Sequence, residues 1–152
     1  MPSFSDLLEV HREMDDKFRQ HQYALLHFDF EKAGKILSSY REQLYAHMGF
    51  EEEVLFPIYE SRATIDPVGG KDLLQTEHDK MRGWVELFVR ETRELASETE
   101  PDSKILDLLE REWFYLKLCS HHDTREKRFL FPGLDAVTTP EEREELLALH
   151  GD

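Results

Sequence analysis

Two stretches of this chain nearly repeat one another. Residues 47–57 read His-Met-Gly-Phe-Glu-Glu-Glu-Val-Leu-Phe-Pro, and residues 122–132 read His-Asp-Thr-Arg-Glu-Lys-Arg-Phe-Leu-Phe-Pro. In both, a His is followed four residues later by a Glu and then by Leu-Phe-Pro, and the copies are 75 residues apart throughout. A His and a Glu four positions apart lie on the same side of a helix. The repeat therefore predicts a duplicated helical unit that presents two nitrogens and two carboxylates.

A lone histidine precedes each copy. Residues 7–14 read Leu-Leu-Glu-Val-His-Arg-Glu-Met, and residues 73–81 read Leu-Leu-Gln-Thr-Glu-His-Asp-Lys-Met. Both segments place a Met three residues after the His. The whole pattern is a His followed by His-x-x-x-Glu, occurring twice. It singles out six candidate metal ligands: His11, His47, Glu51, His78, His122 and Glu126.

Length and charge limit the possible classes of protein. The 152 residues predict one domain, long enough to bury a core without disulfides. A net charge of −14 disfavours binding to nucleic acid or to anionic membranes. We expect no membrane-spanning segment and no signal peptide. The single cysteine, Cys119, predicts a small buried thiol and a reducing, cytoplasmic location.

The apolar residues recur at helical spacing, and no segment alternates as a strand does. We therefore predict an all-α fold, an antiparallel up-down-up-down four-helix bundle over about residues 3–132. The first helix follows a cap at Ser3 or Ser5, and the second follows Asp29 and should kink or end at Pro57. The third and fourth are expected at about 71–97 and 104–129, the fourth ending at Pro132-Gly133. A capping box at residues 139–142 predicts a short terminal helix at about 140–149.

In such a bundle the six candidate ligands lie on inward faces and can meet at one end of the core. Four imidazoles and two carboxylates are costly to bury unless something coordinates or hydrogen-bonds them. A metal centre meets that need, and mixed nitrogen and oxygen ligands suit iron, manganese or zinc. The duplication favours two ions bridged by both glutamates. We expect His11 with His47 at one ion and His78 with His122 at the other.

These motifs resemble the hemerythrin-like (HHE cation-binding) family over about residues 4–132. The resemblance rests on the two lone histidines, the two His-x-x-x-Glu pairs and the two Leu-Phe-Pro tails. It implies a four-helix bundle with a non-haem di-iron centre, bridged by an oxo or hydroxo group and by both carboxylates. Relatives carry, sense or store oxygen or iron, respond to nitric oxide, or show peroxidase-like activity.

The chain departs from the oxygen-carrying hemerythrins at two places. Arg82 stands where they have a further His, and they end with a His and an Asp five residues apart. His121 lies five residues before Glu126, but the repeat favours His122 because His121 aligns with Ala46. Each ion would then have two nitrogens, two carboxylate oxygens and a solvent bridge, leaving a sixth position open. An open position on each ion favours redox turnover or a further ligand over simple oxygen transport.

Three functions remain open on these grounds. The leading one is binding of oxygen, nitric oxide or peroxide for sensing, storage or protection. The second is a di-iron peroxidase or oxidase, with Tyr45 and Tyr115 as candidate proton donors. The third is an iron-binding regulatory module whose helices loosen when iron is lost.

Several polar residues near the motifs receive simpler interpretations. Glu52 and Glu53 are expected on a charged surface, since adjacent helical residues point elsewhere. Asp15 is expected to accept a hydrogen bond from His11, to be solvated, or to pair with Arg82. Three histidines outside the repeat are interpreted as surface or capping residues: His21, His27 and His150.

Overall fold

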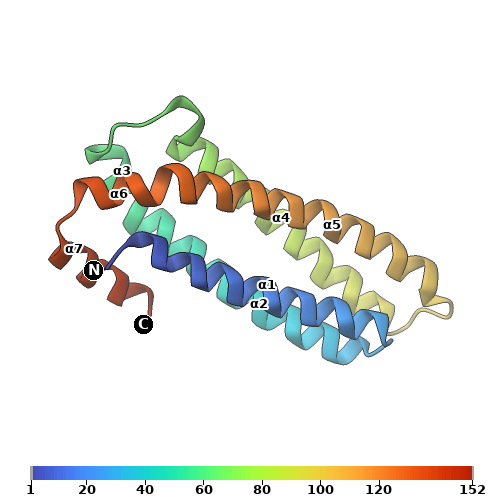
Figure 1. Ribbon diagram of the computed structural model, residues 1–152. Helices are drawn as coiled ribbons and strands as arrows, with labels where there is room; N and C mark the ends of the chain where they lie inside the picture. The colour runs from blue at the N-terminus through green and yellow to red at the C-terminus, as the bar shows by residue number, and fades with distance from the viewer. Residues whose placement is uncertain (1, 152) are drawn as a thin grey trace.

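The computed structural model describes residues 2–151, and nearly all of them are helical (Figure 1). Within this described range there is no strand, which confirms the predicted all-α class. The four long helices are α1 (Leu8–Leu26), α2 (Phe30–Phe50), α4 (Lys71–Leu95) and α5 (Pro101–Arg125). The shorter α-helices are α3 (Phe56–Arg62), α6 (Phe131–Val137) and α7 (Pro140–His150). The remaining turns are η1 (Phe4–Leu7), η2 (Glu51–Leu55), η3 (Pro67–Gly69) and η4 (Glu126–Leu130).

The four long helices run side by side, each opposite in direction to the one before it (Figure 1). Helix α1 packs against α2, α2 against α4, α4 against α5, and α5 against α1. A tight turn joins α1 to α2, with Phe28 at a φ of 58°. The shorter helices α3, α6 and α7 gather at the other end of the molecule, together with the N-terminus.

Side-chain caps begin the helices where the sequence predicted them. Ser3 and Asp6 form a capping box at η1, and Asp29 accepts a hydrogen bond from the Lys32 amide at the start of α2. Thr139 and Glu142 form the expected box at the start of α7. Each cap satisfies amides that have no partner within the helix, and so fixes where the helix begins.

Neither Leu-Phe-Pro segment ends its helix, so the predicted end at Pro132-Gly133 is wrong, and Pro57, predicted to kink or end its helix, does not end it. A π-helical turn follows each candidate ligand glutamate, and an α-helix then continues through the proline. In both copies the Phe amide donates to the carbonyl of the glutamate five residues earlier. One inserted residue widens the turn. The proline then lies in the first turn of the next short helix, where its missing N–H costs little.

The apolar core forms two clusters. The larger lies among the long helices and includes Phe18, Leu37 and Phe88, whereas the smaller joins η1, α3 and α6 around Phe4 and Phe131. Along each long helix or its π-helical continuation, the candidate ligands fall between residues of one cluster and residues of the other. The polar groups therefore occupy a layer between two dry regions.

The side chain of Trp113, on the fourth long helix, is 52% exposed although it lies among apolar positions of the sequence. Its neighbour on the inward side, Glu112, is fully buried instead, for a reason given below. None of the helices within residues 2–151 combines the length and apolar character needed to cross a membrane.

Candidate metal centre

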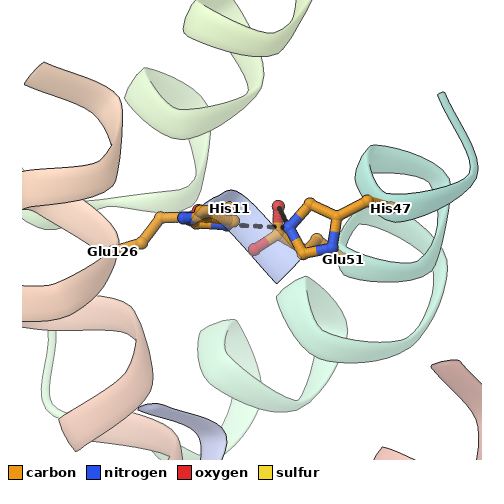
Figure 2. A group of neighbouring side chains, drawn as sticks. All are labelled: His11, His47, Glu51 and Glu126. Atoms are coloured by element: carbon orange, nitrogen blue, oxygen red, sulfur yellow. Dashed lines mark hydrogen bonds and ion pairs between the residues drawn. The ribbon is translucent and has the colours of Figure 1, made fainter. Parts of the chain in front are cut away.

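All six predicted ligands come together in the core, and Figure 2 shows four of them. Each of the four long helices supplies one histidine. Each glutamate opens a π-helical turn, η2 or η4. Because the turn is wide, the Leu and Phe that follow each glutamate still reach the smaller cluster. The six side chains are at most 6% exposed: His11, His47, Glu51, His78, His122 and Glu126.

The first group contains His11, His47, Glu51 and Glu126 (Figure 2). The Nε2 atoms of the two histidines lie 2.9 Å apart. His11 Nε2 lies 3.3 Å from Glu126 Oε1, and His47 Nε2 lies 3.5 Å from Glu51 Oε1. Two nitrogens and two carboxylates therefore converge on one point.

The second group repeats this geometry on the other two helices. His78 Nε2 and His122 Nε2 lie 3.1 Å apart, and they approach Glu51 Oε1 and Glu126 Oε1 at 3.2 and 3.3 Å. Within each group the ligand atoms all lie within 4.8 Å of one another. Both glutamates belong to both groups. This is the pairing of histidines expected from the repeat.

Three of the histidines are held from behind by carboxylates. Asp123 Oδ1 lies 3.1 Å from Nδ1 of His11, Glu52 Oε2 lies 2.7 Å from Nδ1 of His78, and Glu77 Oε1 lies 3.1 Å from Nδ1 of His122. An ionised carboxylate only accepts hydrogen bonds, so the Nδ1 atoms of His78 and His122 carry protons. The contact between His11 and Asp123 is an ion-pair contact without hydrogen-bond geometry. The lone pair of a neutral ring then sits on Nε2 and points into the group. Lone pairs facing each other at about 3 Å repel unless a cation lies between them.

His47 is supported differently from the other three. Its Nδ1 lies 2.8 Å from Nε2 of His150, the last residue of α7. His150 was predicted to be a surface or capping residue, and that prediction is wrong. Its signal was weak because the contact joins residues 103 positions apart and lies outside the repeat.

The bridging carboxylates also indicate a cation. All four carboxyl oxygens of Glu51 and Glu126 are buried and have no hydrogen-bond partner within the described structure. Leaving such acceptors unpaired costs several kcal/mol in total. A metal bound to these oxygens and to the inward Nε2 atoms would satisfy both sets of groups, so the residues present fit a metal centre.

The pKa values agree that positive charge belongs between each pair of histidines. Burial lowers the pKa of His122, but Glu126 and Glu77 outweigh it and raise the pKa to about 10. For its partner His78, burial and the charge of His122 lower the pKa to about 4. In the other pair, burial and the charge of His11 lower the pKa of His47. The pKa of His11 is raised by Asp123 and Glu126 despite burial.

One carboxylate near the site was misassigned from sequence. Glu52 was expected on a charged surface, yet it bonds both the His78 ring and the Arg82 guanidinium, the latter at 2.5 Å. Arg82 also pairs with Asp79. Of the three expectations for Asp15, solvation is confirmed, because its side chain is exposed, while Asp123 is the carboxylate beside His11.

His21 was also predicted to lie at the surface, and it is fully buried. Its Nδ1 donates to the Ala33 carbonyl at 2.9 Å, and its Nε2 lies 2.8 Å from Glu112 Oε2. The sequence did indicate that His21 would be buried, because this residue continues the apolar stripe through Phe18. His27 is exposed, as predicted.

A small cavity of about 20 Å³ borders the site. That volume corresponds to about one water molecule. Besides the first group and His122, its walls include mainly apolar side chains: Met14, Tyr40, Leu44, Met48, Met81 and Cys119. A second cavity of about 260 Å³ shares Asp15, Cys119 and Asp123 with the first, between α1 and α5. Cys119 is buried, as expected, and burial raises the pKa of its thiol.

Tyrosines occupy the core beside this cavity. The hydroxyls of Tyr40 and Tyr115 hydrogen-bond each other, and both side chains are at most 3% exposed. Burial raises the pKa of each phenol well above its usual range. Tyr45, a predicted proton donor, instead bonds Glu86 away from the cavity.

The fold and the two groups of ligands define a helical cation-binding protein. Consistent with this, residues 3–114 match the family described as the hemerythrin HHE cation binding domain, and the chain belongs to that family. No curated protein and no solved structure gives a significant match. The matched range includes the first four candidate ligands. His122 and Glu126 lie beyond it and are supported by the internal repeat and by the geometry.

Proposed function

We propose that this chain is a single-domain, non-haem di-iron protein built on an antiparallel up-down-up-down four-helix bundle. The observation that carries the proposal is the pair of fourfold groups that share Glu51 and Glu126. Six ligands divided in this way hold two ions, with each glutamate bridging them. The ligands are those predicted from sequence: His11, His47, Glu51, His78, His122 and Glu126.

Iron fits the chemistry of this donor set. Imidazole nitrogens with carboxylate oxygens suit iron, and also zinc or manganese, better than calcium or magnesium. The three carboxylates behind the rings, those of Glu52, Glu77 and Asp123, raise the basicity of the histidines and hold them in place. When bound, iron would supply reversible electron exchange with a small ligand. We expect this to occur in the cytoplasm, where a lone thiol such as Cys119 stays reduced.

The ligand we propose is oxygen or a molecule of similar size, such as nitric oxide or peroxide, bound for sensing, storage or protection. The cavity of about 20 Å³ beside the first group accommodates only a few atoms. The methionine and leucine side chains in its wall favour an uncharged guest. The larger cavity between α1 and α5 shares Asp15, Cys119 and Asp123 with it, and we propose that a guest enters from that side.

Peroxidase- or oxidase-like turnover is the second candidate, and one observation favours it. Tyr40 lines the cavity and bonds Tyr115, so a phenol stands within reach of a guest and has a second phenol behind it. This pair could donate a proton at the Tyr40 oxygen. Tyr40, rather than Tyr45, is therefore the residue to test for turnover.

The visible absorption spectrum of ferrous-loaded protein separates these functions. It is recorded without oxygen, then in air, then after degassing, and in parallel with nitric oxide and with peroxide. We expect a charge-transfer band that appears with the ligand and reverses on its removal. Rapid conversion to a stable ferric spectrum with peroxide consumption would favour turnover instead. Absence of any iron spectrum would contradict the di-iron proposal.

A further inference from the structure

The terminal helix α7 has few attachments to the rest of the molecule besides its last residue, one of them a hydrogen bond of 2.8 Å from the Arg143 guanidinium to the Asp135 carbonyl. None of its side chains is fully buried, and Leu146 and Leu147 pack only partly against the smaller apolar cluster. Its ion pair between Glu142 and Arg62 is exposed, and such pairs contribute about 0–1 kcal/mol. Packing alone therefore holds α7 loosely.

His150 joins this helix to the candidate metal centre. Its Nε2 lies 2.8 Å from Nδ1 of His47, and its ring meets the rings of His47 and Phe50 edge to face, with centroids 5.0 Å apart in each case. The end of α7 therefore rests on α2, behind one of the ligands. The other three ligand histidines take their support from carboxylates on α4, η2 and α5, which are parts of the main body.

A metal at Nε2 of His47 would strengthen the contact between these two rings. Coordination at Nε2 leaves the ring proton on Nδ1, which then donates to Nε2 of His150 across the 2.8 Å contact. The positive ion also polarises that N–H, which strengthens the bond. Coupling is reciprocal: if metal binding strengthens docking of α7, docking of α7 must strengthen metal binding by the same factor.

We propose that α7 is a metal-dependent clasp, in which His150 positions His47 and α7 docks firmly only when the first group holds its ion. This rests on the proposed metal centre. The clasp gives metal occupancy a readout at the surface of the protein, because loss of the ion from the first group frees a terminal helix. The support for His47 also becomes separable from the bundle, unlike that of the other three histidines.

The test compares amide hydrogen exchange in α7 with and without ferrous iron, added anaerobically, and counts bound iron in the same samples. We expect exchange in α7 to slow at least about tenfold on loading in the wild-type chain. His150→Ala should abolish this protection. It should also lower the affinity for one of the two ions by about 10- to 100-fold, as loss of the group behind a ligand does in other metal sites. His150→Gln, whose amide oxygen can accept from Nδ1, should restore part of both effects.

His121→Ala is the matched control, because it removes an exposed histidine close to the ligands. It should keep both ions and the metal-dependent protection. Wild-type protein that binds two irons with no change in exchange of α7 would overturn the clasp and leave the metal centre standing. Wild-type protein that binds no iron would overturn the proposed function and the clasp together.

Discussion

Glu51 and Glu126 have a different standing from the four histidines, because each glutamate belongs to both groups of ligands. We predict that Glu51→Ala or Glu126→Ala lowers the occupancy of both metal positions. His47→Ala should lower mainly one, because its Nε2 faces only the first group. Metal content measured by mass spectrometry after anaerobic loading tests this. Retention of two ions per chain by Glu51→Ala would contradict the bridging assignment.

The pair formed by His21 and Glu112 illustrates a polar contact that serves stability instead. Both residues are fully buried, and the pair links α1 to α5 while His21 also bonds the Ala33 carbonyl of α2. We predict that His21→Ala costs about 3 kcal/mol of unfolding free energy, since the buried Glu112 carboxylate loses the partner of Oε2 and keeps only the Gln22 amide at Oε1. Urea unfolding of the metal-free protein measures the loss.

The same variant checks that the two buried polar sites are independent. His21→Ala should still bind two ions when assayed under conditions where it is folded. Replacing both partners, as His21→Leu with Glu112→Met, should recover much of the stability, because neither charge then remains buried. A single variant as stable as wild type would show that the pair contributes little.

Residue identity alone predicted the six candidate ligands, because each carries a strong spacing signal that is repeated. It did not predict their supporting groups. Glu52, Glu77 and Asp123 are adjacent or nearly adjacent to ligands, and their roles depend on which neighbouring helix faces them. His150 depends on how a separate helix folds back. Such contacts follow from tertiary packing and leave no periodic trace.

At the scale of elements, the two π-helical turns are the feature that sequence reasoning missed. The first Leu-Phe-Pro segment was predicted to kink or end its helix, and the second to end it. Each instead follows a widened turn, after which the helix continues past its proline. The turn also lets Glu51 face the other candidate ligands, while Leu55, four residues after it, faces the smaller apolar cluster. Recurrence in both halves indicates that this geometry is part of the duplicated unit.

Deleting one residue from such a turn tests its role. We predict that removing exposed Glu53 converts η2 to an ordinary α-helical turn, because the Phe amide then bonds the Glu51 carbonyl four residues earlier instead of five. The side chain of Leu55, which lies within the narrowed turn, would be rotated away from its place in the core, while Glu51 would stay in place. Thermal unfolding should show a lower melting temperature, with helical circular dichroism at low temperature nearly unchanged.

Deletion of exposed Lys127 is the matched change in the second turn, η4. It should have a similar effect, because Leu130, within that turn, is fully buried as Leu55 is. A substitution at the same place, such as Lys127→Ala, keeps the residue count and should leave stability within about 0.5 kcal/mol of wild type. Deletions as mild as this substitution would show that the π-helical turns are dispensable.

For the whole molecule, metal binding and proton binding compete for the same space. The pKa of His122 is raised to about 10 and burial raises that of Glu51 well above its usual range, so both shifts favour the protonated form in the metal-free protein. A metal must displace these protons. We predict that apparent metal affinity rises as pH increases from 6 toward 9. Protons should be released on binding, measurable by calorimetry in buffers of different ionisation enthalpy.

The raised pKa of His122 also determines whether the stability of the metal-free fold rises or falls with pH. His122 has a folded pKa above its unfolded value near 6.5, so its protonated form stabilises the metal-free fold most fully below pH 6.5. That contribution is lost as the pH rises through about 10. The metal-free protein should therefore lose this contribution where metal binding grows stronger. A metal affinity independent of pH would contradict the competition.

The all-α class, the caps and the convergence of the six candidate ligands could be predicted because each rests on local spacing, which the chain repeats. The groups that support the ligands, the partner of His21 and the docking of α7 could not, because they depend on contacts between distant segments. The family match stops at residue 114, so the second His-x-x-x-Glu is recognised through the internal repeat and the geometry.

The measurement that tests the central claim most directly is anomalous X-ray scattering at the iron edge from crystals of ferrous-loaded protein. We predict two anomalous peaks, one between His11 and His47 and one between His78 and His122. The carboxylates of both bridging glutamates should contact each peak. A single peak, or peaks outside these two groups of ligands, would contradict a bridged two-metal centre.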